Sequence, residues 1–195
     1  MIFKFFWILR GLIYKPLFGK YELPSYVGKP LFIKNFKKIF ISKKVRIFPG
    51  ARIEVIDNNS SIIFEENISI AQNFHIISGG GQKLVIGKNT TISANVFITN
   101  IEHRYDEKDQ HIMNQKLIVG DTQIGSNCFI GYGAVIQAGT ILGKQCIIGS
   151  NAVVRGNFPN YSVIAGIPAK IIKRYDERIN VWRKTNKNGD FIDEI

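Results

Sequence analysis

Residues 118–154 read IVGDTQ-IGSNCF-IGYGAV-IQAGTI-LGKQCI-IGSNAV-V, in which an aliphatic residue returns at every sixth position. The same spacing covers much of the chain before residue 100, with Gly80 as the one miss between Ile56 and Ile98. Neither the 3.6-residue period of an α-helix nor the heptad of a coiled coil matches it. The repeat positions are Ile41, Ile47, Ile53, Ile56, Ile62, Ile68, Phe74, Ile86, Ile92, Ile98, Ile118, Ile124, Ile130, Ile136, Leu142, Ile148 and Val154.

A period of six indicates short, flat strands joined by corners, and three hexads would close one triangular coil of about eighteen residues. Successive coils stack at about 4.8 Å, the ordinary spacing of neighbouring strands. The aliphatic side chains then fill the axis, while Gly and Asn at the corners adopt backbone conformations that other residues disfavour. The sequence therefore predicts an all-β stack with a dry interior.

The repeat breaks between Ile98 and Ile118, which are twenty residues apart. Residues 101–117 must therefore leave the coil as a loop excursion, whose first part reads IEHRYDEKDQH (101–111). Polar loops held by a rigid scaffold commonly carry binding or catalytic residues. We expect the functional site at this excursion.

The length of 195 residues and the 45% of hydrophobic side chains fit one domain with a real core, which excludes disorder as the main state. The apolar run Phe5–Leu9 is five residues long, far too short to span a bilayer. Without a typical secretory leader, a cytoplasmic location is the default. Two cysteines and three histidines without a close cluster argue against a disulfide framework and against a metal site.

The net charge of +11 is concentrated near the N-terminus, because residues 1–48 hold eleven Lys and Arg and a single acid, Glu22. Aromatic and aliphatic residues are mixed with these basic residues, and no nucleic-acid-binding motif follows, so we expect no nucleic-acid partner. Two interpretations stay open for this segment. It is either a helix that caps the coils, or an element that also touches the inner membrane peripherally.

These patterns divide the chain into three parts. Residues 1–40 are expected to form a basic aromatic cap, residues 41–167 the β-helix with its excursion, and residues 168–195 a helix and tail. The segment from Ala169 to Lys184 is predicted to be a short amphipathic helix after Pro168. Such a helix would cover the open strand edge of the last coil.

Two further segments are specific: NVFITNIEH at residues 95–103 and SVIAGIPAK at residues 162–170. Together with the hexads they resemble the hexapeptide-repeat acyltransferases, and in particular the sugar and polysaccharide O-acetyltransferases. The resemblance covers roughly residues 40–175. It implies a left-handed parallel β-helix with short helical N- and C-terminal caps. It further implies a homotrimer with acetyl-CoA sites in the grooves between neighbouring subunits, and no metal.

In this resemblance His103 is the general base. A sugar hydroxyl is a poor nucleophile at neutral pH, and an imidazole with an ordinary pKa of about 6.5 can take its proton during attack on a thioester. A carboxylate often orients such a ring. Glu102 and Asp106 are both candidates for this role, and the sequence does not choose between them.

The family's acetyl-CoA contacts fall on Tyr132, Ser150, Arg155, Lys170 and Lys173. Tyr132 departs from the family pattern, which has a small residue there, although a contact through the backbone amide would survive the change. An acceptor-binding Asn of related sugar enzymes falls at His75, with Asn73 two residues earlier. Tyr105 of the excursion is a third candidate for contact with the acceptor.

The function that these features predict is acetyl-CoA-dependent O-acetylation of a sugar hydroxyl on a cell-surface polysaccharide, an O-antigen or a lipid-linked precursor. Two alternatives stay open. One is acetylation of a small molecule such as serine or a xenobiotic. The other is a non-catalytic hexapeptide-repeat scaffold that binds glycan or membrane.

Overall fold

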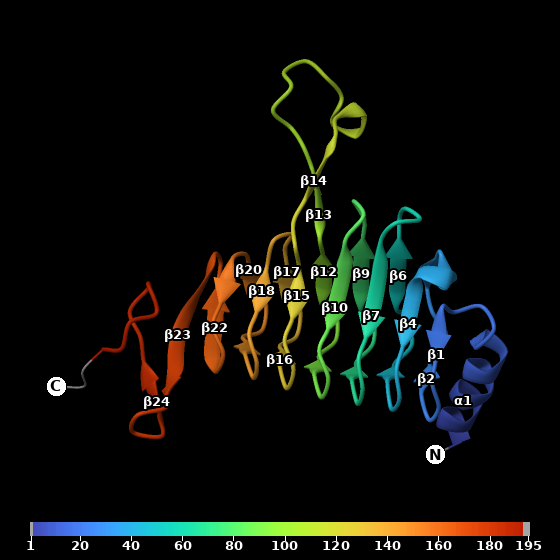
Figure 1. The fold of residues 1–195 in the computed structure, drawn as a ribbon, viewed down its shortest axis with the longest axis horizontal. Coiled ribbons are helices and arrows are strands. Elements are labelled where there is room, and N and C mark those ends of the chain that lie inside the picture. Colours follow the sequence, from blue (N-terminus) through green and yellow to red (C-terminus); the bar gives the residue numbers. More distant parts are fainter. Residues whose placement is uncertain (1, 193–195) are drawn as a thin grey trace.

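The computed structural model describes the backbone of residues 2–192 and the side chains of residues 5–192. Short strands stack in triangular coils along one axis, with helix α1 (Ile2–Tyr14) at the N-terminal end and an arm that projects from the middle of the stack (Figure 1). The chain therefore forms the parallel β-helix that the repeat predicts.

Three sheets make the three faces of the β-helix, and the chain passes from sheet A to sheet B to sheet C in each coil. Sheet A consists of β1 (Lys20–Tyr21), β4 (Ile39–Ile41), β7 (Ser61–Phe64), β10 (Lys83–Ile86), β15 (Gln123–Ile124), β18 (Ile141–Leu142) and β21 (Asn157–Phe158). Sheet B consists of β2 (Tyr26–Val27), β5 (Arg46–Ile47), β8 (Ser69–Ile70), β11 (Thr91–Ile92), β16 (Phe129–Ile130), β19 (Ile147–Ile148), β22 (Ser162–Gly166), β23 (Ala169–Asp176) and β24 (Val181–Lys184). Sheet C consists of β3 (Phe32–Lys34), β6 (Arg52–Val55), β9 (His75–Ser78), β12 (Phe97–Thr99), β17 (Val135–Ile136) and β20 (Val153–Val154).

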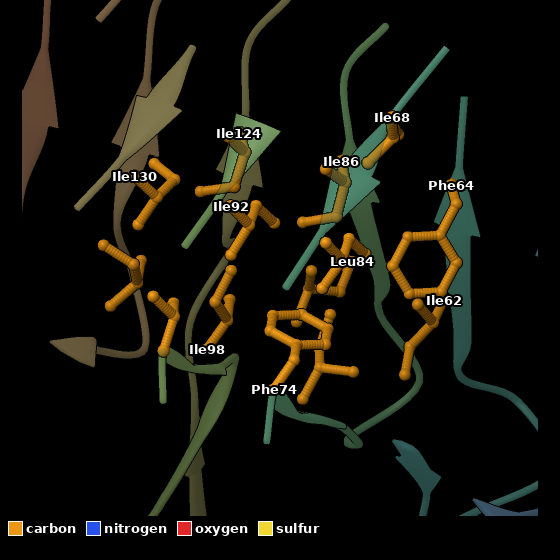
Figure 2. Packing of buried hydrophobic residues seen from close by; sticks show 14 of the residues in the cluster. Ile62, Phe64, Ile68, Phe74, Leu84, Ile86, Ile92, Ile98, Ile124 and Ile130 are labelled. Carbon is orange, nitrogen blue, oxygen red and sulfur yellow. The ribbon is translucent and has the colours of Figure 1, made fainter. Parts of the chain in front are cut away.

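The register explains the period. Ile124 pairs with Leu142 in sheet A and Ile130 pairs with Ile148 in sheet B, so that positions eighteen residues apart lie side by side. Most repeat aliphatics are fully buried along the axis (Figure 2). Ile118 is an exception, since it lies outside the coil on the arm and is 37% exposed, and the prediction that it points inward is wrong.

Several corners of the β-helix are occupied by asparagine residues with a left-handed backbone conformation. Asn73, Asn95 and Asn151 have φ of 57°, 58° and 57°, and each stands where the chain turns from sheet B into sheet C. Asn tolerates this left-handed conformation better than most residues, because its short amide side chain bonds locally. The corner asparagines therefore have a structural role that is independent of any ligand.

The β-helix begins about twenty residues earlier than predicted. Strand β1 already pairs with β4 in a parallel manner, so residues 20–40 form the first coil and only the preceding segment is a cap. A six-residue spacing does recur in the first coil at Tyr21, Val27 and Ile33, which pair with Ile41, Ile47 and Ile53 of the next coil. The repeat is hard to recognise there because Tyr21 replaces an aliphatic residue, although its ring is buried as the aliphatic side chains are.

The predicted C-terminal helix is wrong. Residues 169–176 form β23, which pairs with β22 in an antiparallel manner, and β24 pairs with β23 in turn. The edge of the last coil exposes unpaired backbone groups, and an added strand satisfies them where a helix cannot. β-Branched Ile171, Ile172 and Val181 favour the extended form. The expected covering of the strand edge is thus achieved by strands.

Candidate active site

Three insertions lie at one corner of the β-helix, where consecutive coils pass from sheet C to sheet A. They are the loops at residues 56–60 and 79–82 and the arm between β12 and β15. In the arm, β13 (Ile101–His103) and β14 (Leu117–Val119) pair in an antiparallel manner, and a short 3-10 helix η2 (Ile112–Asn114) lies near the tip. This hairpin is the projection at the top of Figure 1, and it confirms that residues 101–117 leave the coil.

Asn100 fixes the root of the arm. Its side chain is fully buried, accepts a hydrogen bond from the Gly79 N–H at 2.9 Å, and donates one to the Gly79 carbonyl oxygen at 3.1 Å. Its own carbonyl oxygen accepts from the Gly120 N–H at 2.9 Å, where the chain returns to the coil. The side chain of Asn100 therefore joins the root of the arm to the loop of the preceding coil, and its backbone carbonyl joins the two ends of the arm. Asn100 lies within the segment at residues 95–103, and no role for it was predicted from the sequence.

A pocket of about 330 Å³ lies between the arm and the outer face of sheet C. His103 lines this pocket and is itself exposed to solvent, so that a substrate can reach its ring. Most of the lining is apolar. The lining residues are Ile77, Phe97, Thr99, Val135 and Gln137 on the sheet C side, with Ile101, Glu102, His103 and Leu117 on the arm.

Glu102 ties the arm to sheet C. Its Oε2 atom lies 2.9 Å from Nη2 of Arg155, directly after β20, and its Oε1 atom is buried without a hydrogen-bond partner in residues 5–192. Arg155 was predicted to contact acetyl-CoA; its guanidinium lies against the arm in this structure, and the contact with acetyl-CoA stays a prediction. The side chain of Glu102 is 25% exposed and that of Arg155 is 55% exposed, so water partly screens this ion pair.

Asp106 has a different partner. Its Oδ1 atom lies 3.2 Å from Nε of Arg104, and both side chains are largely exposed. Within the described side chains neither Asp106 nor Glu102 makes a hydrogen bond with the His103 ring. The choice of an orienting carboxylate thus stays a prediction for both residues.

His75 lies beside the pocket on the outer face of sheet C. Its ring centroid is 4.9 Å from that of Phe97, and its Nε2 atom is 3.4 Å from Oε1 of Glu54. The same carboxylate oxygen accepts a hydrogen bond from Nε of Arg52. Arg52 and Glu54 were not predicted from the sequence, although their spacing of two residues in a strand puts them on one face.

Charge and burial set the protonation of this cluster. Burial would raise the pKa of Glu54, but the hydrogen bonds and positive charges of Arg52 and His75 outweigh it, so the pKa lies below 4.5. Burial lowers the pKa of His75 below 6.5 and the charge of Arg52 lowers it further, while the hydrogen bond to Glu54 opposes them. The neutral form of the His75 ring is therefore favoured.

We expect the His75 ring to titrate at a pH below 6.5 in the folded protein. Replacing Glu54 with Gln removes the interaction that favours the charged ring, so Glu54→Gln lowers this midpoint further. Arg52→Gln removes a repelling cation and raises it. A titration of the imidazole resonances by NMR measures all three midpoints. A rise in the Glu54→Gln variant would contradict this electrostatic account.

The predicted acetyl-CoA residues lie elsewhere on the β-helix. Tyr132 and Ser150 stand one above the other at the corner from sheet B to sheet C, in adjacent coils. Their backbone N–H groups have no acceptor in the described part of the chain, and the Tyr132 hydroxyl accepts from the Asn95 amide. Lys170 and Lys173 pair with Ala165 and Val163 and share the outer face of sheet B.

The three acceptor candidates are not brought together. His75 is next to the pocket, whereas Asn73 stands at the corner from sheet B to sheet C, and Tyr105 is 78% exposed on the arm. His103 follows the end of a sheet C strand, while Tyr132 and Ser150 precede the start of one. Within one chain, His103 and the predicted acetyl-CoA contacts Tyr132 and Ser150 therefore lie at opposite edges of sheet C.

Residues 112–156 match the family model described as bacterial transferase hexapeptide (six repeats). WbbJ of Escherichia coli (strain K12), named as a lipopolysaccharide biosynthesis O-acetyl transferase, is 32% identical over 163 residues, covering 80% of this chain and 81% of WbbJ. The chain belongs to the bacterial hexapeptide-repeat transferases. A Dictyostelium discoideum protein named as an acetyltransferase is 38% identical over 148 residues, covering 75% of this chain and 70% of that protein.

Solved structures show the same fold. AntD, an N-acyltransferase from Bacillus cereus crystallised with dTDP and 3-hydroxybutyryl-CoA, superposes with a TM-score of 0.72 at 16% identity, covering 87% of this chain and 90% of AntD. A maltose O-acetyltransferase from Clostridium difficile 630 superposes with a TM-score of 0.53 at 22% identity, covering 86% of this chain and 75% of that one. Membership of this family makes the chain an acyltransferase.

Two other findings concern residues 2–192 only. The helix found there is too short to cross a bilayer. No group of three or more His, Cys, Asp or Glu side chains in that range could hold a metal ion.

Proposed function

We propose that the protein transfers an acetyl group from acetyl-CoA to a sugar hydroxyl of a cell-surface polysaccharide, an O-antigen or a lipid-linked precursor. The observation that supports this most is the position of His103. An accessible imidazole lines an apolar pocket at the base of the arm, on the scaffold of an acyltransferase family.

His103 acts as the general base in this proposal. Its ring accepts the proton of the sugar hydroxyl as the oxygen attacks the thioester carbonyl, and it returns the proton to the departing sulfur. The apolar walls formed by Phe97, Ile77 and Val135 limit the water that would otherwise compete as nucleophile. Glu102, held by Arg155, keeps the arm at a fixed distance from sheet C and thereby positions the ring.

The corner from sheet B to sheet C is suited to binding acetyl-CoA, the acyl donor. Acetyl-CoA has amide carbonyls along its pantetheine arm, and the unpaired N–H groups of Tyr132 and Ser150 are suitable donors for them. Lys170 and Lys173 on the adjoining face supply positive charge for the phosphates. Arg155 is less suited to this task, because Glu102 already neutralises it.

The separation of base and donor residues supports a homotrimer. In such a trimer, the arm of one protomer would lie beside Tyr132 and Ser150 of the next protomer. His103 would then be close to the thioester of an acetyl-CoA molecule that the neighbouring protomer binds. The active site would then be complete only between protomers. We place this assembly in the cytoplasm, where acyl-CoA donors are available.

The sheet C face supports a saccharide acceptor. Carbohydrates bind where aromatic rings lie beside polar groups that match their hydroxyls, and here Phe97 lies next to His75 and Glu54. His75 and Glu54 would bind a sugar hydroxyl, with Tyr105 and Asn73 as more distant candidates. The name of WbbJ points to the same class of acceptor for a relative of this chain.

A panel of acceptors tests the function. CoA release from acetyl-CoA is measured with nucleotide sugars, lipid-linked oligosaccharides, free oligosaccharides, serine and a xenobiotic alcohol. We expect the best saccharide to exceed serine by at least about tenfold in kcat/KM, because a site built for several hydroxyls leaves polar groups unpaired with a smaller acceptor. Faster turnover of serine, or none with any saccharide, would contradict the proposal.

A further inference from the structure

Helix α1 is held to the end of the β-helix by one side. The Trp7 ring lies 5.6 Å from that of Tyr26 and 5.4 Å from that of Phe48. Gly11 follows one turn later and is buried so tightly that a Cβ atom would collide with the Tyr21 ring. Tyr14 continues this stripe and packs against Phe36. A spacing of four and three residues is that of a single helical face.

The opposite side of α1 is also apolar. A helix on the surface of a soluble protein normally turns polar residues outward, but among the described side chains of α1, residues 5–14, the outward ones are 41–65% exposed and all hydrophobic. Exposed apolar surfaces of this kind mark contacts with other molecules. The residues of this outward face are Phe5, Phe6, Ile8, Leu9, Leu12, Ile13 and, just after the helix, Leu17.

The part of the chain that contains α1 and the first coil carries most of the net positive charge. Residues 1–48 carry eleven basic side chains and one acid, whereas the other 147 residues carry fifteen and fourteen. The Lys37 ammonium donates to the Pro16 carbonyl oxygen at 2.8 Å, which places this one cation of the first coil close to the end of α1. Exposed lysines of this segment are Lys15, Lys20, Lys29, Lys34, Lys37, Lys43 and Lys44.

We propose that the outward face of α1 docks on an anionic lipid bilayer. The helix would lie in the plane of the interface with its exposed aromatic and aliphatic side chains among the acyl chains, while the lysines of the first coil meet the headgroups. Pairing of the face with a second copy is disfavoured, because each copy carries the same concentration of positive charge. This inference does not depend on which acceptor the enzyme uses.

Vesicle flotation tests the proposal with the full chain. The vesicles are phosphatidylcholine alone or phosphatidylcholine mixed with phosphatidylglycerol. The double variant Phe5→Gln/Ile13→Gln changes the two most exposed residues of the face, at 65% each, and leaves the packed side of α1 intact. The matched control is Ile179→Gln, which changes a residue 57% exposed in the turn before β24, at the other end of the molecule.

We expect the protein to float with the anionic vesicles and to partition about tenfold less onto neutral ones. The double variant should lose about tenfold or more of its partition coefficient, and the control should match the unaltered protein. Three results would overturn the proposal. The first is that the protein does not float with anionic vesicles, and the second is that the double variant floats as well as the unaltered protein. The third is that the molar mass in lipid-free solution halves in the double variant, which would show that the outward face binds a second copy of the chain.

Discussion

His103→Ala is expected to lower kcat for acetyl transfer by about 10²–10⁴-fold, the contribution typical of a general base. The KM for acetyl-CoA should change little, since in the proposed arrangement the donor is bound by the corner residues Tyr132 and Ser150 and not by the arm. The fold should be unaffected, because the side chain of His103 is exposed and carries no hydrogen bond within residues 5–192. The rate of CoA release with the best saccharide acceptor measures the loss.

His111→Ala is the matched control for this variant. It makes the same substitution on the same arm, where the His111 ring only accepts a hydrogen bond from the Met113 N–H at the start of η2. We expect its turnover to remain within about threefold of the unaltered enzyme. Equal losses in both variants would mean that the arm responds to truncation in general, and that His103 has no specific chemical role.

Asn100→Ala is expected to disable the enzyme by another route. The substitution leaves the N–H and the carbonyl of Gly79 without partners in a buried place, at a cost of about 1–3 kcal/mol for each group. The root of the arm then loosens and the His103 ring loses its position. Because a displacement of about 1 Å at a reacting group can cost about 100-fold in rate, we expect a fall in kcat of that order.

Two readouts separate this effect from general unfolding. Hydrogen exchange should speed up at Gly79 and Gly120 while the buried strands of the coil stay protected. Asn114→Ala, a substitution of the same kind on the exposed part of the arm, should leave both kcat and exchange unchanged. An Asn100→Ala enzyme with full activity would show that the position of the arm does not depend on this amide.

The central part of the fold follows directly from the sequence, because the aliphatic residues at every sixth position from Ile124 to Val154 are buried inside the β-helix. The arm was predictable for the same reason, since an insertion of polar residues in a strict repeat has to leave the coil. Ile118 shows that the six-residue spacing alone does not place a residue inside the coil. It continues the spacing of Ile124 by coincidence, and only the pairing of β13 with β14 places it on the arm.

The C-terminal segment could not be predicted from local preference. Pro168 and the mixed apolar pattern after it are compatible with a helix, and what decides the outcome is the unpaired edge of β22, a feature of the assembled fold. The pairing of Glu102 with Arg155 is equally invisible, because the two residues are 53 positions apart. Arg52 and Glu54 could have been found, since two opposite charges alternate there with a buried Ile53 in one strand.

The most direct test of the central claim is a crystal structure of the enzyme with CoA and a saccharide acceptor. The account predicts that the His103 ring lies within about 3 Å of the acceptor hydroxyl, the reach of a hydrogen bond, and that Tyr132 and Ser150 of a neighbouring protomer hold the CoA. CoA bound far from every His103 ring, or a complete site within a single chain, would contradict it.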